Sequence, residues 1–167
     1  MRRFSVKKFN IKRDPLAALA VLAATLTSAC ASMSYDVGDR QFASCEAYAP
    51  AYKVTDDFMS SFNTKDAAKF GAVFHFPSVR IASNSVRIIN GPQDLESGFA
   101  TLGAQGWDHS AWAKRKVVQC GPTKAHMLTT FVRYRADNSE MSRFDSLYIV
   151  EFKNGRWGLT ARSSFAP

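Results

Sequence analysis

The strongest constraint on the fold of this chain is the pair Asn154-Gly155, which lies between two runs of strand-forming residues. Both central positions of a type I′ turn need positive φ, and Asn-Gly is the pair that best tolerates it. A two-residue loop there sets the pairs that face each other, namely Phe152 with Trp157, Val150 with Leu159, Tyr148 with Ala161, Ser146 with Ser163 and Phe144 with Phe165. The sequence therefore predicts a hairpin over residues 144–165 with one largely apolar face.

The opposite face of this hairpin is mixed in character. It carries Asp145 and Arg162 as diagonal neighbours, close enough to form an ion pair. We therefore expect Arg162 on the outer face of a sheet, paired with Asp145. The apolar face is expected to turn towards covering helices.

The charge of the chain is concentrated at its start. The chain has 167 residues, which predicts one domain, and its net charge is +8. Six basic residues and one aspartate fall within residues 1–14, which leaves +3 for the rest. A domain this weakly basic lacks the concentrated positive stripe that nucleic-acid phosphates need, so its charge argues against nucleic-acid binding.

A short apolar run, residues 16–27, follows the basic start and ends in small residues. A basic head, a short apolar middle and a small-residue exit are typical of a secretory signal, and the run is too short for a permanent membrane span. Residues 26–30, LTSAC, resemble a bacterial lipobox, with Thr27 where leucine is usual. The resemblance implies a signal peptide over residues 1–29, a lipidated Cys30 and delivery to the outer membrane, facing the periplasm. Conventional cleavage near Cys30, giving a secreted or periplasmic protein, is the alternative.

Two cysteines, Cys45 and Cys120, remain once Cys30 is set aside. In an oxidising compartment they favour a disulfide, which would close a loop of about 75 residues and stabilise the fold by about 4 kcal/mol. Two buried thiols are the alternative. Neither cysteine has a histidine or a second cysteine at metal-ligand spacing, so we expect no metal site and no cofactor.

The rest of the chain shows helical periodicity first and long strands last. Residues 30–45 are polar, small and aperiodic, which predicts a flexible tether before a domain over residues 46–167. Asn63 or Thr64 is the expected cap of the second helix. The expected elements are a helix from residue 46, a helix over 65–74, strands over 79–82 and 86–89, a helix from residue 92, and strands over 109–120, 124–135, 142–152 and from 156. This order predicts an α+β fold in which a curved antiparallel sheet wraps around three helices.

Three local motifs accompany this order of elements. They are Phe74-His75-Phe76-Pro77 before the first strand, Asn90-Gly91 before the third helix, and the closing segment from Gly155-Arg156-Trp157 to Arg162-Ser163-Ser164. With them, residues 46–165 resemble the nuclear transport factor 2-like superfamily, which includes SnoaL-like cyclases and ketosteroid isomerases. The resemblance implies a cystatin-like cone with a cavity at its open end. It implies no particular reaction, because the scaffold carries enzymes, binders and assembly factors alike.

In such a cone the apolar face of the last hairpin faces the cavity, and Tyr148 and Ser163 are polar groups on an apolar wall. Arg80 could enter the cavity and hold an anionic ligand, because a guanidinium binds carboxylates in a two-pronged way. The expected ligand-binding residues are Tyr52, Phe76, Arg80, Trp107, His109, Tyr148 and Ser163. The alternatives are a core tyrosine at 148, a tryptophan plug at the cone mouth and a solvent-facing Arg80.

Ketosteroid isomerases carry a carboxylate immediately before the proline of the first strand and a protonated acid in the fifth strand. The matching positions here are Phe76 and Tyr148, so the proton-abstracting group is missing. His75 or His109 could replace that base, with Tyr148 as the hydrogen-bond donor to a bound oxygen, and structural roles are the alternative for both histidines. The catalytic candidates are therefore Tyr148, His75 and His109.

The strand over residues 124–135 is apolar on both sides, and helices can cover only one of them. We expect a second copy on the other side, as a homodimer through the outer sheet face. The sequence thus predicts an exported domain that binds a small hydrophobic or amphipathic molecule, without assured catalysis. The alternatives are a lyase or isomerase acting on a carbonyl or polyketide-like substrate, and a scaffolding module of the cell envelope.

Overall fold

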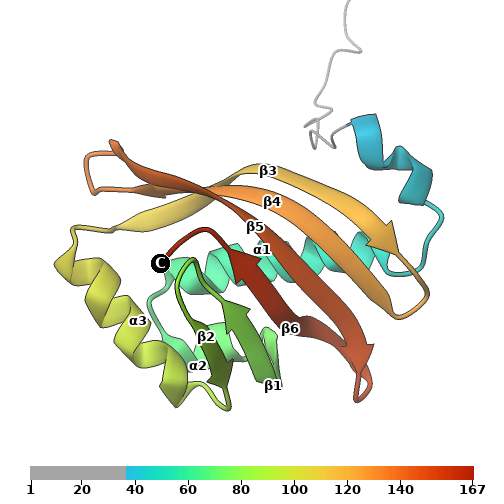
Figure 1. Ribbon diagram of the computed structural model, residues 1–167, viewed down its shortest axis with the longest axis horizontal. Coiled ribbons are helices and arrows are strands. Elements are labelled where there is room, and N and C mark those ends of the chain that lie inside the picture. Colours follow the sequence, from blue (N-terminus) through green and yellow to red (C-terminus); the bar gives the residue numbers. More distant parts are fainter. Residues whose placement is uncertain (1–36) are drawn as a thin grey trace, which may run out of the picture. The chain divides into compact units, whose positions relative to one another are not determined.

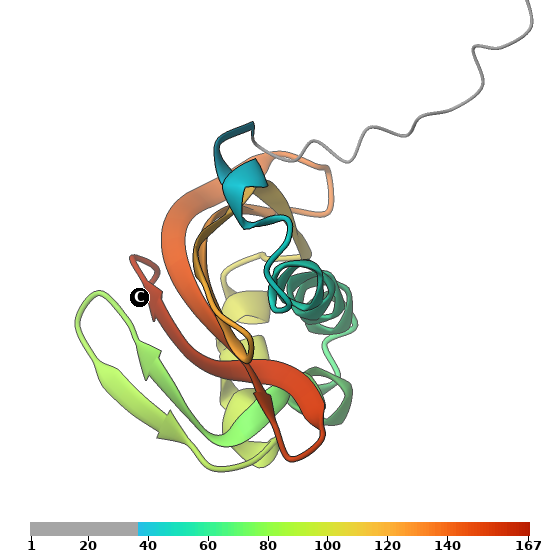
Figure 2. The same ribbon diagram turned by 90° about the vertical axis from the view of Figure 1, so that its right-hand side faces the viewer.

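Three α-helices pack against the concave side of a six-stranded sheet in the computed structural model, which describes residues 37–167 (Figure 1). The elements are the 3-10 helix η1 (Val37–Phe42), α1 (Tyr48–Asn63), α2 (Ala67–Gly71), β1 (Phe74–Ile81), β2 (Val86–Ile89), α3 (Gln93–Ala104), β3 (His109–Cys120), β4 (Lys124–Tyr134), β5 (Glu140–Lys153) and β6 (Arg156–Ser164). The sheet order is β2-β1-β6-β5-β4-β3, with β1 and β6 parallel and the other neighbours antiparallel. Figure 2 shows the long strands curling around α1. The predicted α+β fold and its order of elements are confirmed.

Helix α1 lies against the sheet because one of its sides is apolar. Tyr52 and Phe58 are buried on this side. On the solvent side, Lys53 and Asp57 lie one turn apart and form an ion pair of 2.8 Å. The alternation of these two sides is the pattern that predicted the helix.

The second helix is shorter than the sequence predicts. Its cap is Asp66, rather than Asn63 or Thr64. The Asp66 carboxylate accepts hydrogen bonds from the backbone N–H groups of Ala68 and Lys69, both at 3.0 Å. These bonds satisfy two of the donors that a helix start leaves free, and they fix where α2 begins.

Strand β1 begins at Phe74, inside the segment predicted to be helical. Phe74 pairs with Leu159 of β6 and is buried, with its ring 4.9 Å from that of Phe70. Pro77 lies within β1 rather than before it. The parallel pairing with β6 therefore overrides the local helical pattern, since the strand gains both backbone partners and a buried aromatic side chain.

The last hairpin forms as predicted near its turn. Asn154 and Gly155 both have positive φ, 54° and 75° respectively. Residues 150–153 face residues 156–159 in the expected register. The turn chemistry thus sets the pairing over this part of β5 and β6.

A β-bulge then shifts the register of β6 by one residue, with Thr160 as the extra residue. Tyr148 consequently faces Arg162 instead of Ala161. A shift of one residue exchanges the two faces of a strand. Arg162 therefore lies on the inner face, where we predicted an outer position, and Ser163 is exposed, where we predicted a cavity position.

The predicted ion pair between Asp145 and Arg162 is wrong for the same reason. The bulge carries Arg162 to the side of the sheet that faces the helices. The Asp145 carboxylate instead accepts a hydrogen bond from Thr130 Oγ1 on the neighbouring strand, at 2.6 Å. Asp145 therefore keeps an outer position without an arginine partner from β6.

The chain before α1 is joined to the sheet by a disulfide between Cys45 and Cys120. Their Cα atoms lie 6.2 Å apart, and the bond closes a loop across 75 residues. Phe42, at the end of η1, packs against the core, so regular structure begins inside the segment predicted to be a tether. The alternative of two free thiols is wrong. The predicted signal peptide, residues 1–29, and the lipidation site Cys30 lie outside the described residues.

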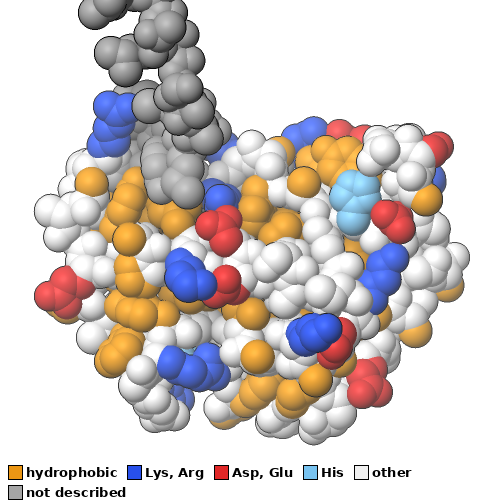
Figure 3. All heavy atoms as spheres, turned by 180° about the vertical axis from the view of Figure 1, so that it is seen from behind, with side chains coloured by type: hydrophobic (Ala, Val, Ile, Leu, Met, Phe, Trp, Pro, Cys, Tyr) orange, Lys and Arg blue, Asp and Glu red, His pale blue; other side chains and the backbone are white. Residues whose placement is uncertain are grey.

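The outer face of the sheet keeps apolar side chains exposed. Val86 and Ile88 of β2 are 68% and 54% exposed, and Leu128 of β4 is 46% exposed. Seen from behind, the molecule instead carries acidic and basic side chains interspersed with hydrophobic ones, without a broad patch of one charge (Figure 3).

Within residues 37–167, no helix combines the length and hydrophobicity needed to cross a membrane. The homodimer through the outer face stays a prediction.

Candidate functional site

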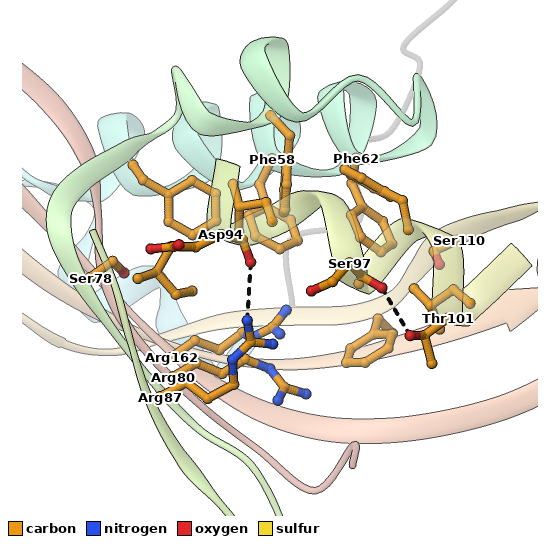
Figure 4. A pocket seen from close by; sticks show the side chains of 18 of the residues that line it. Phe58, Phe62, Ser78, Arg80, Arg87, Asp94, Ser97, Thr101, Ser110 and Arg162 are labelled. Carbon is orange, nitrogen blue, oxygen red and sulfur yellow. Dashed lines mark hydrogen bonds between the residues drawn. The ribbon is translucent and has the colours of Figure 1, made fainter. Parts of the chain in front are cut away.

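A cavity of about 350 Å³ lies between the sheet, α3 and the second half of α1. Its size falls in the range of about 300–1,000 Å³ that is typical of small-molecule sites. Two kinds of side chain dominate its lining. The aromatic ones are Phe58, Phe62, Phe70, Phe74, Phe99 and Phe131, and the basic ones are Arg80, Arg87, Arg133 and Arg162. Figure 4 shows Phe58 and Phe62 across the cavity from Arg80, Arg87 and Arg162.

The aromatic wall is a packed cluster. The ring of Phe58 lies 4.8 Å from that of Phe70, and the ring of Phe62 lies 5.1 Å from that of Phe70 and 5.4 Å from that of Phe99. These edge and tilted contacts are the arrangements that aromatic pairs favour. The wall therefore offers a rigid apolar surface to anything that enters the cavity.

The basic wall is a row of side chains set by strand register. Arg87 of β2 faces Arg80 of β1, Arg80 faces Arg162 of β6, and Arg162 faces Tyr148 of β5. Residues opposite each other on neighbouring strands point to the same side of the sheet. The row therefore crosses four strands and faces the cavity, as Figure 4 shows for its three arginines.

The hydrogen bonds of this row go to carbonyl and hydroxyl oxygens. Arg87 Nη2 donates to the backbone carbonyl of Asp94 at 3.0 Å, and Arg80 Nη2 donates to an oxygen of the last residue, Pro167, at 2.7 Å. Arg162 Nη1 donates to the hydroxyl of Tyr148 at 3.3 Å. The acceptors of Arg87 and Arg162 are neutral, so these bonds leave the charges of those two arginines uncompensated.

Arg133 of β4 also lines the cavity, and its Nε is buried without a hydrogen-bond partner. Its guanidinium carbon lies 5.1 Å from the ring centre of Phe144 and 5.7 Å from that of Phe131. A guanidinium held between aromatic faces is oriented without being neutralised. Arg133 is therefore a fourth positive charge that faces the cavity, and none of the residues that the structure describes forms an ion pair with it.

Burial and mutual repulsion act on these arginines. Burial, followed by the positive charges of Arg162, Arg87 and Arg133, lowers the pKa of Arg80 to about 10. Burial also lowers the pKa of Arg133, with the charge of Arg162 as the next cause. The guanidinium groups stay charged at neutral pH, so the wall presents several positive charges to one cavity.

The side chain of Tyr148 faces the cavity. It is 1% exposed, lines the cavity and accepts the hydrogen bond from Arg162. Burial raises the pKa of its phenol, against the opposing charge of Arg162. The hydroxyl therefore keeps its proton at neutral pH and can donate it in a hydrogen bond to a bound oxygen.

Arg80 is the second predicted ligand-binding residue that lines the cavity. Three other predicted ligand-binding residues lie outside the cavity lining. The Tyr52 hydroxyl donates to the carbonyl of Arg115 at 3.4 Å, and the ring of Phe76 stacks on that of Phe74 at 5.9 Å. Ser163 is exposed beyond the bulge. These three predicted positions therefore do not contribute to the cavity.

Trp107 lies behind the aromatic wall instead of in the cavity lining. Its ring is 4.8 Å from that of Phe62, and its indole N–H donates to Ser110 Oγ at 2.9 Å. It is 4% exposed. The structure thus makes Trp107 a support of the wall, because its apolar ring packs on Phe62 while its one polar group is satisfied.

The two candidate histidines lie outside the cavity lining. His75 is buried, and its Nε2 is 3.2 Å from the carbonyl oxygen of Glu151. His109 stacks on Tyr134 at 5.1 Å, and its Nδ1 is 3.0 Å from the carboxylate of Asp108. A catalytic role shared with Tyr148 would require the histidine to line the same cavity. Neither His75 nor His109 does so. Among residues 37–167, no three His, Cys, Asp or Glu side chains gather as a group that could hold a metal ion.

Arg87, Arg133 and Arg162 line the cavity although the sequence patterns did not indicate them. A signal for Arg87 was present, because pairing of the two short strands places it opposite Arg80. Arg162 could not be placed from the sequence pattern, because the bulge at Thr160 exchanges the two faces of β6. Arg133 had no local signal, since its position depends on how far β4 extends over the helices.

The comparisons with known proteins agree with this architecture. The family profile described as NTF2-like protein (DUF6841) matches residues 49–164. A protein of unknown function with a cystatin-like fold from Nostoc punctiforme superposes with a TM-score of 0.58 at 15% identity, over 70% of this chain and 88% of that chain. An NTF2-like protein of unknown function from Pseudomonas putida gives 0.58 at 11% identity, over 72% and 87%. An NTF2-like protein from Cytophaga hutchinsonii gives 0.55 at 9% identity, over 71% and 97%.

These structural matches are too distant in sequence to indicate more than the fold. No curated protein matches the chain. The family match covers most of the described residues, from the start of α1 to the end of β6. The chain therefore belongs to the NTF2-like family DUF6841.

Proposed function

We propose that this domain binds a small amphipathic molecule in the cavity of the cone. The observation that carries the proposal is the pairing, in one cavity of about 350 Å³, of an aromatic wall with a wall of arginines and Tyr148. Ligand sites combine apolar surface, which supplies affinity, with a few polar groups that set orientation. The two walls of this cavity divide these tasks between them.

We do not include catalysis in the proposal. The position before Pro77, where the isomerases carry their base, holds Phe76. His75 and His109 do not line the cavity, and its lining contains one acidic side chain, that of Asp94. The Asp94 carboxylate accepts a hydrogen bond from the backbone N–H of Asn90 at 2.7 Å. The lyase or isomerase alternative therefore lacks a group placed to abstract a proton.

Export and membrane anchoring belong to the same proposal. The disulfide between Cys45 and Cys120 supports an oxidising compartment, where such bonds persist. A lipid on Cys30 would hold the domain at the periplasmic side of the outer membrane. Mass spectrometry of the chain isolated from membranes tests this part, since an unmodified Cys30 would contradict it.

The binding proposal is tested by filling the cavity. Gly98 lies on α3 and lines the cavity, and no atom lies within 4 Å of the Cβ that a substitution would add. Gly103, on the same helix, is equally open and lies outside the lining. Gly98→Phe should therefore occupy the cavity, and Gly103→Phe is its matched control.

The probe is N-phenyl-1-naphthylamine, an uncharged molecule whose fluorescence rises in apolar surroundings. We expect saturable binding to the full chain and to Gly103→Phe, and binding weaker by roughly tenfold or more for Gly98→Phe, because the added ring removes the apolar contacts. Equal binding by Gly98→Phe, or no binding by the unmodified chain, would contradict the proposed function.

A further inference from the structure

The arginine row is costly to the free protein. Arg87, Arg80 and Arg162 face one another directly across three neighbouring strands. Like charges at directly opposite positions destabilise a sheet. The unfavourable free energy of three facing arginines indicates a function for them in the cavity that they line.

The arginines that line the cavity differ from other arginines of this chain, which form ion pairs with acidic side chains. Outside the cavity, Arg115 pairs with Asp56 at 2.6 Å and Arg143 pairs with Glu140 at 2.8 Å. Within residues 37–167, no Asp or Glu side chain lies within ion-pairing distance of any of the cavity arginines, and Arg80 donates to an oxygen of the last residue, Pro167. The four cavity arginines are Arg80, Arg87, Arg133 and Arg162. The site is therefore built with an excess of positive charge that an anion would balance.

Three of the guanidinium groups belong to one wall of the cavity. Arg80 and Arg162 lie directly opposite each other on neighbouring strands, and Arg133 lines the same cavity. After the larger effect of burial, the charge of Arg162 lowers the pKa of both Arg80 and Arg133. The guanidinium carbon of Arg162 lies 5.7 Å from the ring centres of both Phe58 and Tyr148. Arg162 of the basic wall thus contacts Phe58 of the aromatic wall.

We propose that the ligand is a carboxylic acid with one negative charge and a hydrophobic, ring-containing body. The carboxylate is held by Arg80, Arg133 and Arg162, and the Tyr148 hydroxyl donates to it. The body lies against Phe58, Phe62 and their neighbours. This assignment rests on the proposed function and names its ligand class.

The choice of carboxylate over phosphate follows from Asp94. Its side chain lines the same cavity, and the first turn of α3 carries both Asp94 and Glu96. These charges would repel a phosphate dianion more strongly than a single carboxylate. The planar guanidinium fork also matches the two oxygens of a carboxylate.

The test compares three probes that share a phenyl ring on a short alkyl chain. They are 4-phenylbutyrate, the uncharged 4-phenylbutanol and the dianionic 3-phenylpropyl phosphate, each titrated into the full chain by calorimetry. We expect 4-phenylbutyrate to bind more tightly than either of the others by roughly tenfold or more, as the loss of charged hydrogen bonds implies.

Each outcome separates this inference from the proposed function. Equal binding of 4-phenylbutanol, tighter binding of the phosphate, or no binding of any of the three while N-phenyl-1-naphthylamine still binds would overturn the carboxylate assignment and leave the cavity proposal standing. Failure of all four probes would overturn both.

Two variants test the named arginines. Arg162→Gln and Arg133→Met should each weaken binding of 4-phenylbutyrate by about tenfold. Binding of 4-phenylbutanol should change much less than binding of 4-phenylbutyrate, because the alcohol carries no charge for these arginines to hold. Arg143→Gln removes a surface arginine outside the cavity and is the matched control.

The stability of the free protein shows whether these variants fold. Because Arg133→Met removes an uncompensated charge, its unfolding temperature should equal or exceed that of the unmodified chain. Unchanged carboxylate binding in both folded variants would overturn the assignment.

Discussion

The two walls of the cavity differ in what they contribute to the molecule. The aromatic wall around Phe58 is held by contacts among its own rings, so each ring stabilises its neighbours. The basic wall around Arg162 is made of groups that repel one another. The comparison teaches that the aromatic wall stabilises the free protein whereas the basic wall destabilises it, so substitutions on the two walls should change the free energy of unfolding with opposite signs.

The largest effect is expected on the aromatic wall. Phe58→Ala removes a ring that is 2% exposed and that packs against Phe70, Phe74 and Tyr148. The free energy of unfolding should fall by about 3–5 kcal/mol, because the loss combines apolar transfer with a cavity. Urea denaturation measures it. Leu128→Ala, at an exposed position of the outer face, is the control, and a loss for Phe58→Ala no larger than the control's would show that this wall does not carry stability.

The disulfide should have the next largest effect. Cys45 and Cys120 pack against the same core cluster as Phe58, so the bond reinforces the stabilising side of the molecule. Replacing both by serine should lower the free energy of unfolding by about 2–4 kcal/mol, since the unfolded chain regains the entropy of a long loop. Binding of 4-phenylbutyrate should persist in the folded variant. A stability equal to that of the unmodified protein would contradict the bond's role.

The basic wall should respond in the opposite direction. Arg133→Met keeps an unbranched side chain between Phe131 and Phe144 but removes a charge whose Nε has no partner. We expect the free energy of unfolding to rise by about 1 kcal/mol in the absence of ligand, because a buried donor without an acceptor costs about that much. A clear fall in urea denaturation would mean that the arginine stabilises the free protein, and the contrast between the walls would fail.

The smallest effect concerns His75, which is buried away from the cavity. Burial lowers its pKa below the ordinary value, and the charges of Arg156 and Lys153 add to this. The neutral form is therefore favoured in the folded state. This contribution to stability is complete above about pH 6.5, the ordinary pKa of histidine, and declines as the pH falls below it.

Substitution of His75 tests that pH dependence. Denaturation series between pH 7.5 and 5 should show a shallower decline for His75→Gln than for the unmodified chain. Identical slopes would mean that His75 does not contribute to the decline. Binding of 4-phenylbutyrate should keep the same affinity in this variant, because His75 lies outside the cavity lining.

The sequence predicted the fold because its strongest signals are local. The Asn154-Gly155 turn set the register of the adjoining pairs, and alternation along β5 placed Tyr148 inside. The bulge at Thr160 lies in the other strand of the hairpin, so it left Tyr148 in place and exchanged Arg162 with Ser163. A single extra residue carries no signal in an otherwise regular strand, which is why the candidate site was less predictable than the fold.

The long-range positions could not be derived from local patterns. Arg80 was predicted to line the cavity, whereas Arg133 comes from a strand that reaches the site only through the curvature of the sheet. His109 and Trp107 were expected at the cavity from their spacing. The structure instead pairs His109 with Asp108 and packs Trp107 behind Phe62.

The most direct test of the account is the nuclear magnetic resonance of the arginine side chains during titration with 4-phenylbutyrate. If the basic wall holds an anion, the Nε–H signals of Arg80, Arg133 and Arg162 should shift together and saturate, while the signal of Arg143 stays in place. Signals of the three cavity arginines that remain fixed, or that shift no more than the signal of Arg143, would contradict the claim that this wall holds an anion.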